Sequence, residues 1–317
     1  MTAAGPPGHC WLPARVRRSA GELAIDWAWF GDRRLTEPFY EDTVAAVRGA
    51  APLVSTPLAD LASWSDRPAS LEPTGLIFHM SRCGSTLASQ MLAASAANIV
   101  VSEAGPIDAA VRLEGTEEGR VELLRAMVGA LGQVRNAGEA RYFLKLDSWH
   151  ACALPLFRAA FPRTPWAFLY RAPAAVMVSH ARRAGMQLVA DLVPPAFYGL
   201  DPGGRAWGED YRAQVLGAIC GAAVREYPAG GGMLVNYDEL PDAVWTRLLP
   251  HFGVTPSPEE LAAMAAAAGL DAKSPSVPFT PDAATKRGAT TAAIEQAVER
   301  RLAGVYLQLE ALRRAAS

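Results

Sequence analysis

One short segment, Ser81 to Thr86, combines the residue types that bind a phosphate-sized anion. It lies between an apolar run, Leu76–Met80, and a helix-like pattern that begins at Leu87. A tight turn feeding directly into a helix aims free backbone N–H groups and the positive end of the helix dipole at one point. The predicted ligands are a forked cation, backbone amides and two hydroxyls, supplied by Arg82, Cys83, Gly84, Ser85 and Thr86.

Two other phosphate loops do not fit this segment. In the pattern GxxxxGK[ST] the first glycine is missing here, and Ser85 stands where the lysine belongs. A cysteine-phosphatase loop needs an arginine six positions after the cysteine, but Ser89 occupies that position after Cys83. A polar strand-to-helix turn without any ligand stays open as an alternative.

A second anion site is predicted further along the chain. Arg171 follows the apolar run Trp166–Tyr170, and Pro173 suits the first turn of the helix that comes next. Ser179 lies roughly 9 Å along this helix at about 1.5 Å per residue, so its hydroxyl and the arginine could hold one phosphate together. The alternative for Arg171 alone is a solvated or salt-bridged residue.

The two segments, in this order, resemble the sulfotransferases that use 3'-phosphoadenosine-5'-phosphosulfate (PAPS). The family's [KR]-x-G-[ST]-T core is matched by the residues from Arg82 to Thr86, and its R-x7-S pattern by Arg171 and Ser179. The resemblance implies that the first segment binds the 5'-phosphosulfate and the second binds the 3'-phosphate. It covers residues 74 to 317 and implies PAPS as cofactor, PAP as product and no metal.

Two weaker similarities point the same way. The segment Val235 to Leu240 resembles the family's strand ending, in which a tyrosine lines the adenine side, here Tyr237. Lys286, Arg287 and Gly288 are similar to the basic C-terminal segment that closes over the 3'-phosphate. A plain strand-to-helix cap and a surface basic pair are the respective alternatives.

Sulfuryl transfer requires a cation at the departing phosphate and a base at the acceptor. Arg82 is assigned an electrostatic role, because a guanidinium does not readily donate a proton. Three residues at predicted strand ends are candidate bases, in the order Glu103, Asp147 and His150. The resemblance places Glu103 where some bacterial members carry a glutamate and Asp147 where cytosolic members carry a histidine. Capping, packing or pairing with Lys145 or Arg82 are the structural alternatives.

The elements that must position these residues follow a regular alternation from residue 75 onward. Apolar runs typical of buried strands alternate with segments of helical spacing. The predicted strands are Leu76–Met80, Ile99–Val101, Tyr142–Leu146, Trp166–Tyr170 and Met233–Val235, and the predicted helices include Val121–Leu131, Ala174–Arg183, Tyr211–Glu226 and Ala292–Leu312. This order predicts an α/β fold, a P-loop-like, doubly wound parallel sheet flanked by helices, with ligands at the carboxyl ends of the strands.

The chain divides at about residue 70. Residues 1–70 differ in texture from the rest and are expected to form a small N-terminal cap with a strand at Leu23–Phe30 and a helix at Asp42–Arg48. Residues 71–317 form the expected sulfotransferase-like α/β domain. An insertion rich in proline and glycine, residues 185–207, is a candidate lid or acceptor-binding wall.

Composition excludes several function classes. With 317 residues, 50% apolar content and a net charge of -2, the chain can bury a core and carries no field that would attract nucleic acid or anionic lipid. The four cysteines lack the spacing of a metal knuckle or a redox dithiol. The first residues lack the apolar run of a secretion signal, so we expect a cytoplasmic protein with no membrane partner.

The sequence therefore predicts a PAPS-dependent transferase acting on a hydroxyl or amine of a small acceptor that the sequence does not identify. A nucleotide-dependent kinase of related fold and a PAP-binding protein without catalysis are the alternatives. The sequence does not indicate the oligomeric state.

Overall fold

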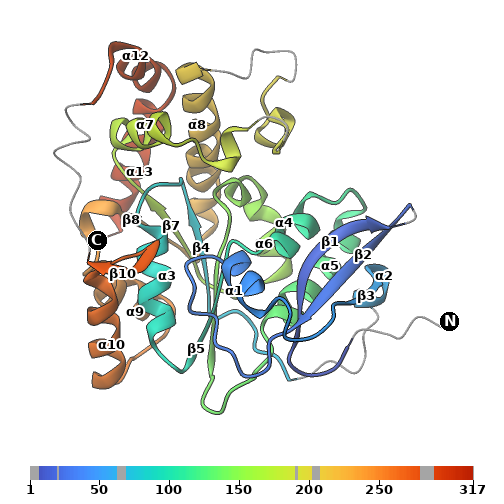
Figure 1. The fold of residues 1–317 in the computed structure, drawn as a ribbon. Coiled ribbons are helices and arrows are strands. Elements are labelled where there is room, and N and C mark those ends of the chain that lie inside the picture. The colour runs from blue at the N-terminus through green and yellow to red at the C-terminus, as the bar shows by residue number, and fades with distance from the viewer. Residues whose placement is uncertain are drawn as a thin grey trace.

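The computed structural model describes residues 7–19, 21–62, 69–189, 192–201, 208–278 and 289–316. At its centre is a parallel sheet of five strands with the order β5-β6-β4-β7-β8 (Figure 1). The strands are β4 (Gly75–His79), β5 (Asn98–Ser102), β6 (Arg141–Lys145), β7 (Trp166–Tyr170) and β8 (Gly232–Asn236). All five predicted strands are present, within one or two residues of their expected ends.

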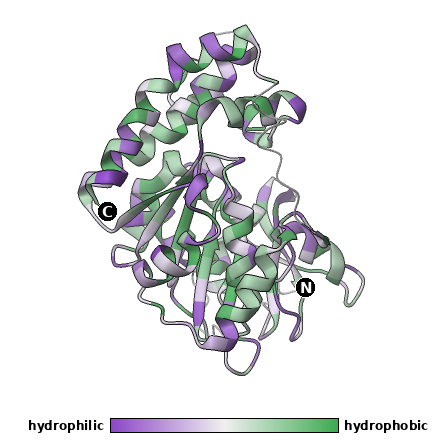
Figure 2. Cartoon of the chain, turned by 90° about the vertical axis from the view of Figure 1, so that its left-hand side faces the viewer, coloured by the Kyte–Doolittle hydropathy of each residue, from purple (hydrophilic) through white to green (hydrophobic). Residues whose placement is uncertain are grey.

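The strands form because their apolar runs are covered on both faces. Every residue of β4, β5 and β7 is buried. Continuous rather than alternating burial is typical of a parallel sheet between two layers of helices. Figure 2 shows the hydrophobic colour along the strands inside the molecule, whereas the outer helices carry both colours. The predicted α/β fold class is confirmed.

Helices connect the strands and cover the sheet. Those of the main domain are α3 (Ser85–Ala94), α4 (Gly105–Arg112), α5 (Glu117–Leu131), α6 (Leu154–Ala160), α7 (Pro173–Arg182), α8 (Gly208–Glu226), α9 (Leu249–His251), α10 (Pro258–Ala268), α12 (Ala292–Arg301) and α13 (Ala303–Ala315). The prediction of one continuous helix from Ala292 was wrong: the chain breaks at Leu302, whose φ is -120° and whose side chain is buried. Close approach of α12 to α8 accompanies this break, because the carbonyl of Arg301 lies 2.9 Å from where a Cβ on Gly217 would be.

The order of the strands creates one crevice at their carboxyl ends. From the central strand β4 the chain runs through α3 to the edge strand β5, whereas from β7 it runs through α7 and α8 to the opposite edge strand β8. The connections after these two neighbouring strands therefore leave in opposite directions. Such a switch point opens a space between the loops, and ligands bind there in doubly wound sheets.

The N-terminal region forms a second, antiparallel sheet. It consists of β1 (Trp11–Ser19), β2 (Glu22–Trp29) and β3 (Val54–Pro57), together with α1 (Tyr40–Val47) and α2 (Ala59–Ala62). Strand β1 packs against α4 and α5 of the main domain (Figure 1). The segment before α1 reaches the carboxyl end of the large sheet, so the N-terminal region contributes to the site described below.

Short elements complete the described chain. The insertion after α7 contains two single-turn helices, Met186–Leu188 and Pro195–Tyr198. A small hairpin, β9 (Leu270–Asp271) and β10 (Ser274–Pro278), follows α10 and lies beside α3 in Figure 1. Among the residues that the model describes, none of the helices has the length and apolar character needed to span a bilayer.

Candidate active site

The loop between β4 and α3 has a backbone suited to holding an anion. Ser81, Arg82 and Gly84 have φ values of 75°, 53° and 83°, in the left-handed region. For residues with a side chain this conformation costs on the order of 1 kcal/mol or more, and it persists only where the surroundings enforce it. The N-cap residue of α3 is Gly84, which has no side chain to cap the helix, and the first residues of the helix line the adjoining cavity.

Two contacts hold this loop in place. The thiol of Cys83 is fully buried and donates to the carbonyl of Leu169 at 3.1 Å. Burial raises the pKa of this thiol to about 12, so Cys83 anchors the loop rather than acting as a nucleophile. On the other side, a Cβ at Gly84 would lie 2.6 Å from Leu240 and 3.0 Å from Tyr237, so only glycine fits.

A cavity of about 360 Å³ opens above this loop, and we call it the loop cavity. Its walls come from the loop, from the end of β7, from α7, from the end of β8 and from the β9–β10 hairpin. They include every predicted binding residue that the model describes: Arg82, Cys83, Gly84, Ser85, Thr86, Arg171, Ser179 and Tyr237. Lys286, Arg287 and Gly288 lie outside the described residues.

Arg171, the second predicted cation, is held in place by contacts with Tyr237 and Met80. Arg171 is 6% exposed, and its guanidinium carbon lies 3.8 Å from the centre of the Tyr237 ring. Its amide donates to the sulfur of Met80 at the end of the neighbouring strand. The contact with the ring holds the guanidinium at the wall of the cavity, where its N–H groups can bind an anion.

The loop cavity is strongly cationic. Arg82, Arg171, Arg183 and Lys273 all line it, and none of them forms an ion pair with a carboxylate of the described residues. Arg82 donates to the backbone carbonyl of Arg183 at 2.9 Å, so the two residues lie next to each other in the wall of the loop cavity. Burial and the charge of Arg183 lower the pKa of Arg82 below its usual range, as expected where like charges lie close together.

A second cavity of about 430 Å³ adjoins the first, and we call it the Glu103 cavity. Phe39, Trp149 and Met186 supply apolar surface, Glu41 and Asp42 supply acidic groups, and Glu103 and His79 lie in its wall. The predicted insertion contributes Gly185, Met186 and Gln187, and the N-terminal region contributes Phe39, Glu41 and Asp42. The two regions thus meet at this cavity.

Glu103 is the candidate base that the structure places in a cavity. It follows β5 with a φ of 52°, a turn that directs its carboxylate toward the end of β6. There it accepts a hydrogen bond from Lys145, whose side chain is fully buried and whose Nζ also lies 3.4 Å from Thr86 Oγ1. Lys145 therefore connects the candidate base to the loop between β4 and α3.

His79 completes the surroundings of this carboxylate. Its Nδ1 accepts from the amide of Ser81 at 3.0 Å, so the neutral ring carries its proton on Nε2. That nitrogen lies 3.2 Å from Glu103 Oε1, although the two are not aligned for a hydrogen bond. Burial lowers the pKa of His79, so the ring is neutral and contacts Glu103 without competing for its proton.

The charge of Glu103 is set by a balance of two effects. Burial by itself would raise the pKa of this carboxyl, but the ammonium of Lys145 lowers it well below the usual value. Glu103 is therefore ionised at neutral pH and can accept a hydrogen bond from a hydroxyl. The same ion pair weakens it as a base compared with an unpaired carboxylate.

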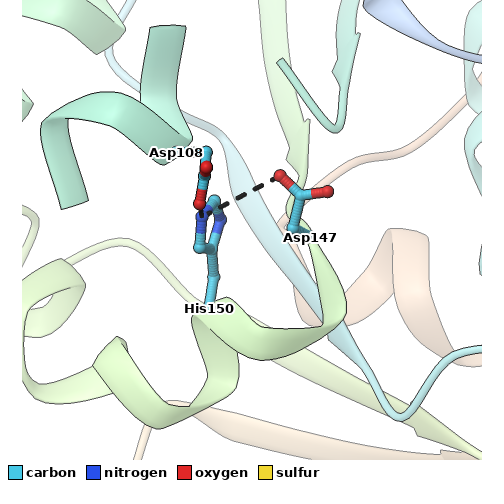
Figure 3. Close-up of side chains that lie close together, drawn as sticks. All are labelled: Asp108, Asp147 and His150. Atoms are coloured by element: carbon cyan, nitrogen blue, oxygen red, sulfur yellow. Dashed lines mark hydrogen bonds and ion pairs between the residues drawn. The ribbon is translucent and has the colours of Figure 1, made fainter. Parts of the chain in front are cut away.

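The other two candidate bases lie behind the site. Asp147 and His150 are both buried, and neither lines the loop cavity or the Glu103 cavity. Figure 3 shows His150 directed toward Asp108 and Asp147, with Nε2 3.1 Å and 3.9 Å from their respective oxygens. Burial raises the pKa of Asp147 well above its usual value, and the negative charge of Glu103 raises it further.

This trio has the spacing of a metal-ligand set among the described residues. However, Asp108 already accepts hydrogen bonds from the Trp149 indole at 2.6 Å and pairs with Arg112 at 2.9 Å. The oxygens of Asp108 thus already accept hydrogen bonds from groups of the protein itself. The arrangement holds the turn after β6 in position, and through it the Trp149 wall of the Glu103 cavity.

Sequence reasoning missed four cations of the site. Lys145, Arg182, Arg183 and Lys273 were not predicted as site residues, although all four contribute to the walls or to the hydrogen bonds of the cavities. Lys145 had a signal, because a charged residue at the end of an apolar strand stands at the carboxyl edge of the sheet. Lys273 had no such signal, since it lies more than a hundred residues along the chain from the loop between β4 and α3.

Comparisons with known proteins were made with the sequence and with the structure. No family model and no curated protein matches the chain. The solved structures that are similar to it include three sulfotransferases. They are the sulfotransferase domain from the curacin biosynthetic pathway (15% identity, TM-score 0.41, covering 73% of this chain and 98% of that one), the sulfotransferase STF9 from Mycobacterium avium (13%, 0.47, 74% and 77%) and the sulfotransferase domain from the olefin synthase of Synechococcus PCC 7002 (15%, 0.42, 79% and 96%).

Proposed function

We propose that this protein transfers a sulfuryl group from PAPS to a hydroxyl or amine of a small acceptor. The observation that carries the proposal is a single cavity that two separate cationic sites line. One is the loop with Arg82, and the other is Arg171 with Ser179. PAPS is an adenosine with anionic groups at both ends of its ribose, and it requires this kind of two-ended site.

Each part of the loop cavity has a matching part of the cofactor. The amides and hydroxyls from Gly84 to Thr86 would hold the 5'-phosphosulfate at the N-terminus of α3. The guanidinium of Arg171 and the hydroxyl of Ser179 would bind the 3'-phosphate. Tyr237 would offer an aromatic face to the adenine, and it also supports Arg171.

The Glu103 cavity would take the acceptor. It shares five residues with the loop cavity, namely Arg82, Ser85, Thr86, Arg183 and Lys273. An acceptor bound there would face the end of the cofactor that carries the sulfuryl group. Its aromatic walls favour an acceptor with an apolar body, and Glu103 would bind the reacting hydroxyl or amine.

The reaction would proceed by in-line displacement. The bond between sulfur and the bridging oxygen of the phosphosulfate breaks as sulfur bonds to the acceptor atom, and the acceptor proton passes to Glu103. Arg82 and the loop amides offset the negative charge that develops on the departing phosphate, and removal of one such donor costs on the order of 3 kcal/mol in comparable sites. Lys145 holds the carboxylate of Glu103 at its place beside Thr86.

A comparison of nucleotides tests the proposal. We expect PAP to raise the melting temperature of the protein, and AMP and ATP, which lack a 3'-phosphate, to have little effect. Stabilisation by ATP with magnesium in preference to PAP would support the alternative of a kinase and overturn the proposal. Binding of PAP without any release of PAP from PAPS in the presence of a panel of alcohols, phenols and amines would indicate a PAP-binding protein without catalysis.

A further inference from the structure

The turn of the β9–β10 hairpin presents a lysine to both cavities. Leu270 to Lys273 line the loop cavity, and Lys273 lines the Glu103 cavity as well. The carboxylate of Asp271 accepts from the amides of Lys273 and Ser274, each at 2.9 Å. These two bonds set the shape of the turn, so the side chain of Lys273 starts from a defined backbone position.

The wall shared by the two cavities is where the chemistry of a transfer must take place. A group that leaves a ligand in one cavity and joins a ligand in the other passes the shared residues. Three of these five residues are cations, Arg82, Arg183 and Lys273. Arg82 and Arg183 belong to the elements at the strand ends, whereas Lys273 comes from the hairpin that lies over them.

Lys273 lies among other cations at the wall between the two cavities. Although much of the residue is exposed, desolvation of its ammonium and the charges of Arg82, Lys145 and Arg183 lower its pKa to about 8, whereas the charge of Glu103 raises it. Its Nζ lies 5.9 Å from the centre of the Phe39 ring, the ring that also contacts Lys145 at 4.9 Å. No carboxylate of the described residues pairs with it. A cation held among cations is stabilised when an anion binds between them.

We propose that Lys273 is a further catalytic residue of the sulfuryl transfer, whose ammonium binds the oxygens of the transferring group at the wall between the two cavities. This inference rests on the proposed function. As the bond between sulfur and the bridging oxygen breaks, its electron pair stays on that oxygen, where Arg82 and the loop amides offset the charge, while Lys273 holds the sulfuryl oxygens as sulfur bonds to the acceptor atom. Lys273 keeps its proton, while the acceptor proton goes to Glu103.

The first test separates binding of the sulfuryl group from binding of the nucleotide. The affinities of PAPS and PAP are measured by calorimetry for the wild type, Lys273→Met and Lys273→Arg. We expect Lys273→Met to weaken PAPS binding about tenfold, as for the loss of one charged hydrogen bond, and PAP binding by less than about twofold. Val277→Ala, an exposed position on the same hairpin outside both cavities, is the matched control and should leave both affinities unchanged.

The second test measures turnover with 2-naphthol as a probe acceptor, or with water where the phenol is not accepted, as PAP released from PAPS. Lys273→Met should lower the rate about a hundredfold, and Lys273→Arg should restore most of it. In the wild type, kcat/KM for PAPS should fall as the pH rises past about 8, and Lys273→Arg should remove this decline, because the guanidinium stays charged.

The outcomes distinguish the two proposals. If the wild type binds PAP selectively but Lys273→Met binds PAPS and releases PAP as the wild type does, the role of Lys273 is wrong and the proposed function stands. If the wild type binds neither PAP nor PAPS, the proposed function fails, and the inference about Lys273 fails with it. Equal losses of PAPS and PAP affinity in Lys273→Met would also overturn the inference, since they would show a general effect on the cavity.

Discussion

The guanidinium of Arg171 lies over the ring of Tyr237, with 3.8 Å between the guanidinium carbon and the centre of the ring. The two residues come from the ends of neighbouring parallel strands, β7 and β8. Both residues line the loop cavity, so the contact supports the arginine at the cavity wall. The affinity of this site for a phosphate should therefore depend on both side chains.

Replacement of Arg171 tests the 3'-phosphate site. Arg171→Ala should weaken PAP binding about 10- to 100-fold, the loss of one or two charge-assisted hydrogen bonds, and should leave AMP binding nearly unchanged. Arg171→Lys should be intermediate, because an ammonium neither stacks on Tyr237 nor forms a forked contact. Calorimetry with both nucleotides measures the difference, and equal losses for PAP and AMP would contradict the assignment.

Gly84 offers a test of the loop geometry. Gly84→Ala combines a left-handed φ of 83° with a Cβ only 2.6 Å from Leu240, so we expect a loss of roughly 2–4 kcal/mol of folding free energy or a displaced loop. Gly138→Ala is the matched control, because its φ is 90° but nothing lies within 4 Å of the added Cβ. It should cost only about 1–2 kcal/mol in urea unfolding. Similar losses in both variants would show that the packing of the loop is looser than described.

Glu103 is expected to act in turnover and hardly in nucleotide binding. Glu103→Gln retains an oxygen that accepts from Lys145 but removes the proton acceptor, so the rate of PAP release should fall about 10²- to 10⁴-fold. PAP affinity should change by less than about threefold. Asp147→Asn serves as the comparison, since Asp147 lies outside both cavities. Unchanged turnover in Glu103→Gln would remove this carboxylate from the mechanism.

Asp147 should affect stability in a manner that depends on pH. Burial raises its pKa above that of the unfolded chain, so the carboxyl destabilises the folded protein at neutral pH and has no such effect below the unfolded pKa of about 3.9. Asp147→Asn should therefore raise the free energy of unfolding at about pH 7 and have little effect at about pH 3.5. Urea unfolding at the two pH values measures this, and a stabilisation that is equal at both would contradict the raised pKa.

Much of the fold followed from local patterns in the sequence. Runs such as Trp166–Tyr170 are apolar at every position, which is typical of a strand covered on both faces, and the structure buries each of these residues. The antiparallel strand β1 was missed, because its run contains Pro13 and three arginines, Arg15, Arg17 and Arg18, that resemble a solvated segment. Arg15 and Arg17 share an ion pair with the buried Asp26 of β2, a partner that only the pairing of the strands reveals.

The order of bases among Glu103, Asp147 and His150 could be ranked but not resolved from the sequence. All three residues follow predicted strands, so the sequence places them at the same edge of the sheet. Which carboxylate faces a cavity depends on backbone angles such as the φ of 52° at Glu103 and on burial by the turn after β6. Neither quantity is encoded in the spacing of residue types.

The sequence by itself determined the order of the strands of the central sheet along the chain, the glycine-containing turn at Arg82 and the place of Arg171 at the end of its strand. Each of these depends on neighbours within a few positions. Only the tertiary structure decided that these two cations share one cavity, that Lys145 pairs with Glu103 and that Lys273 joins them from a distant hairpin. The physical reason is the order of the sheet, which brings the connections after β4 and β7 side by side although α3, β5 and β6 separate them along the chain.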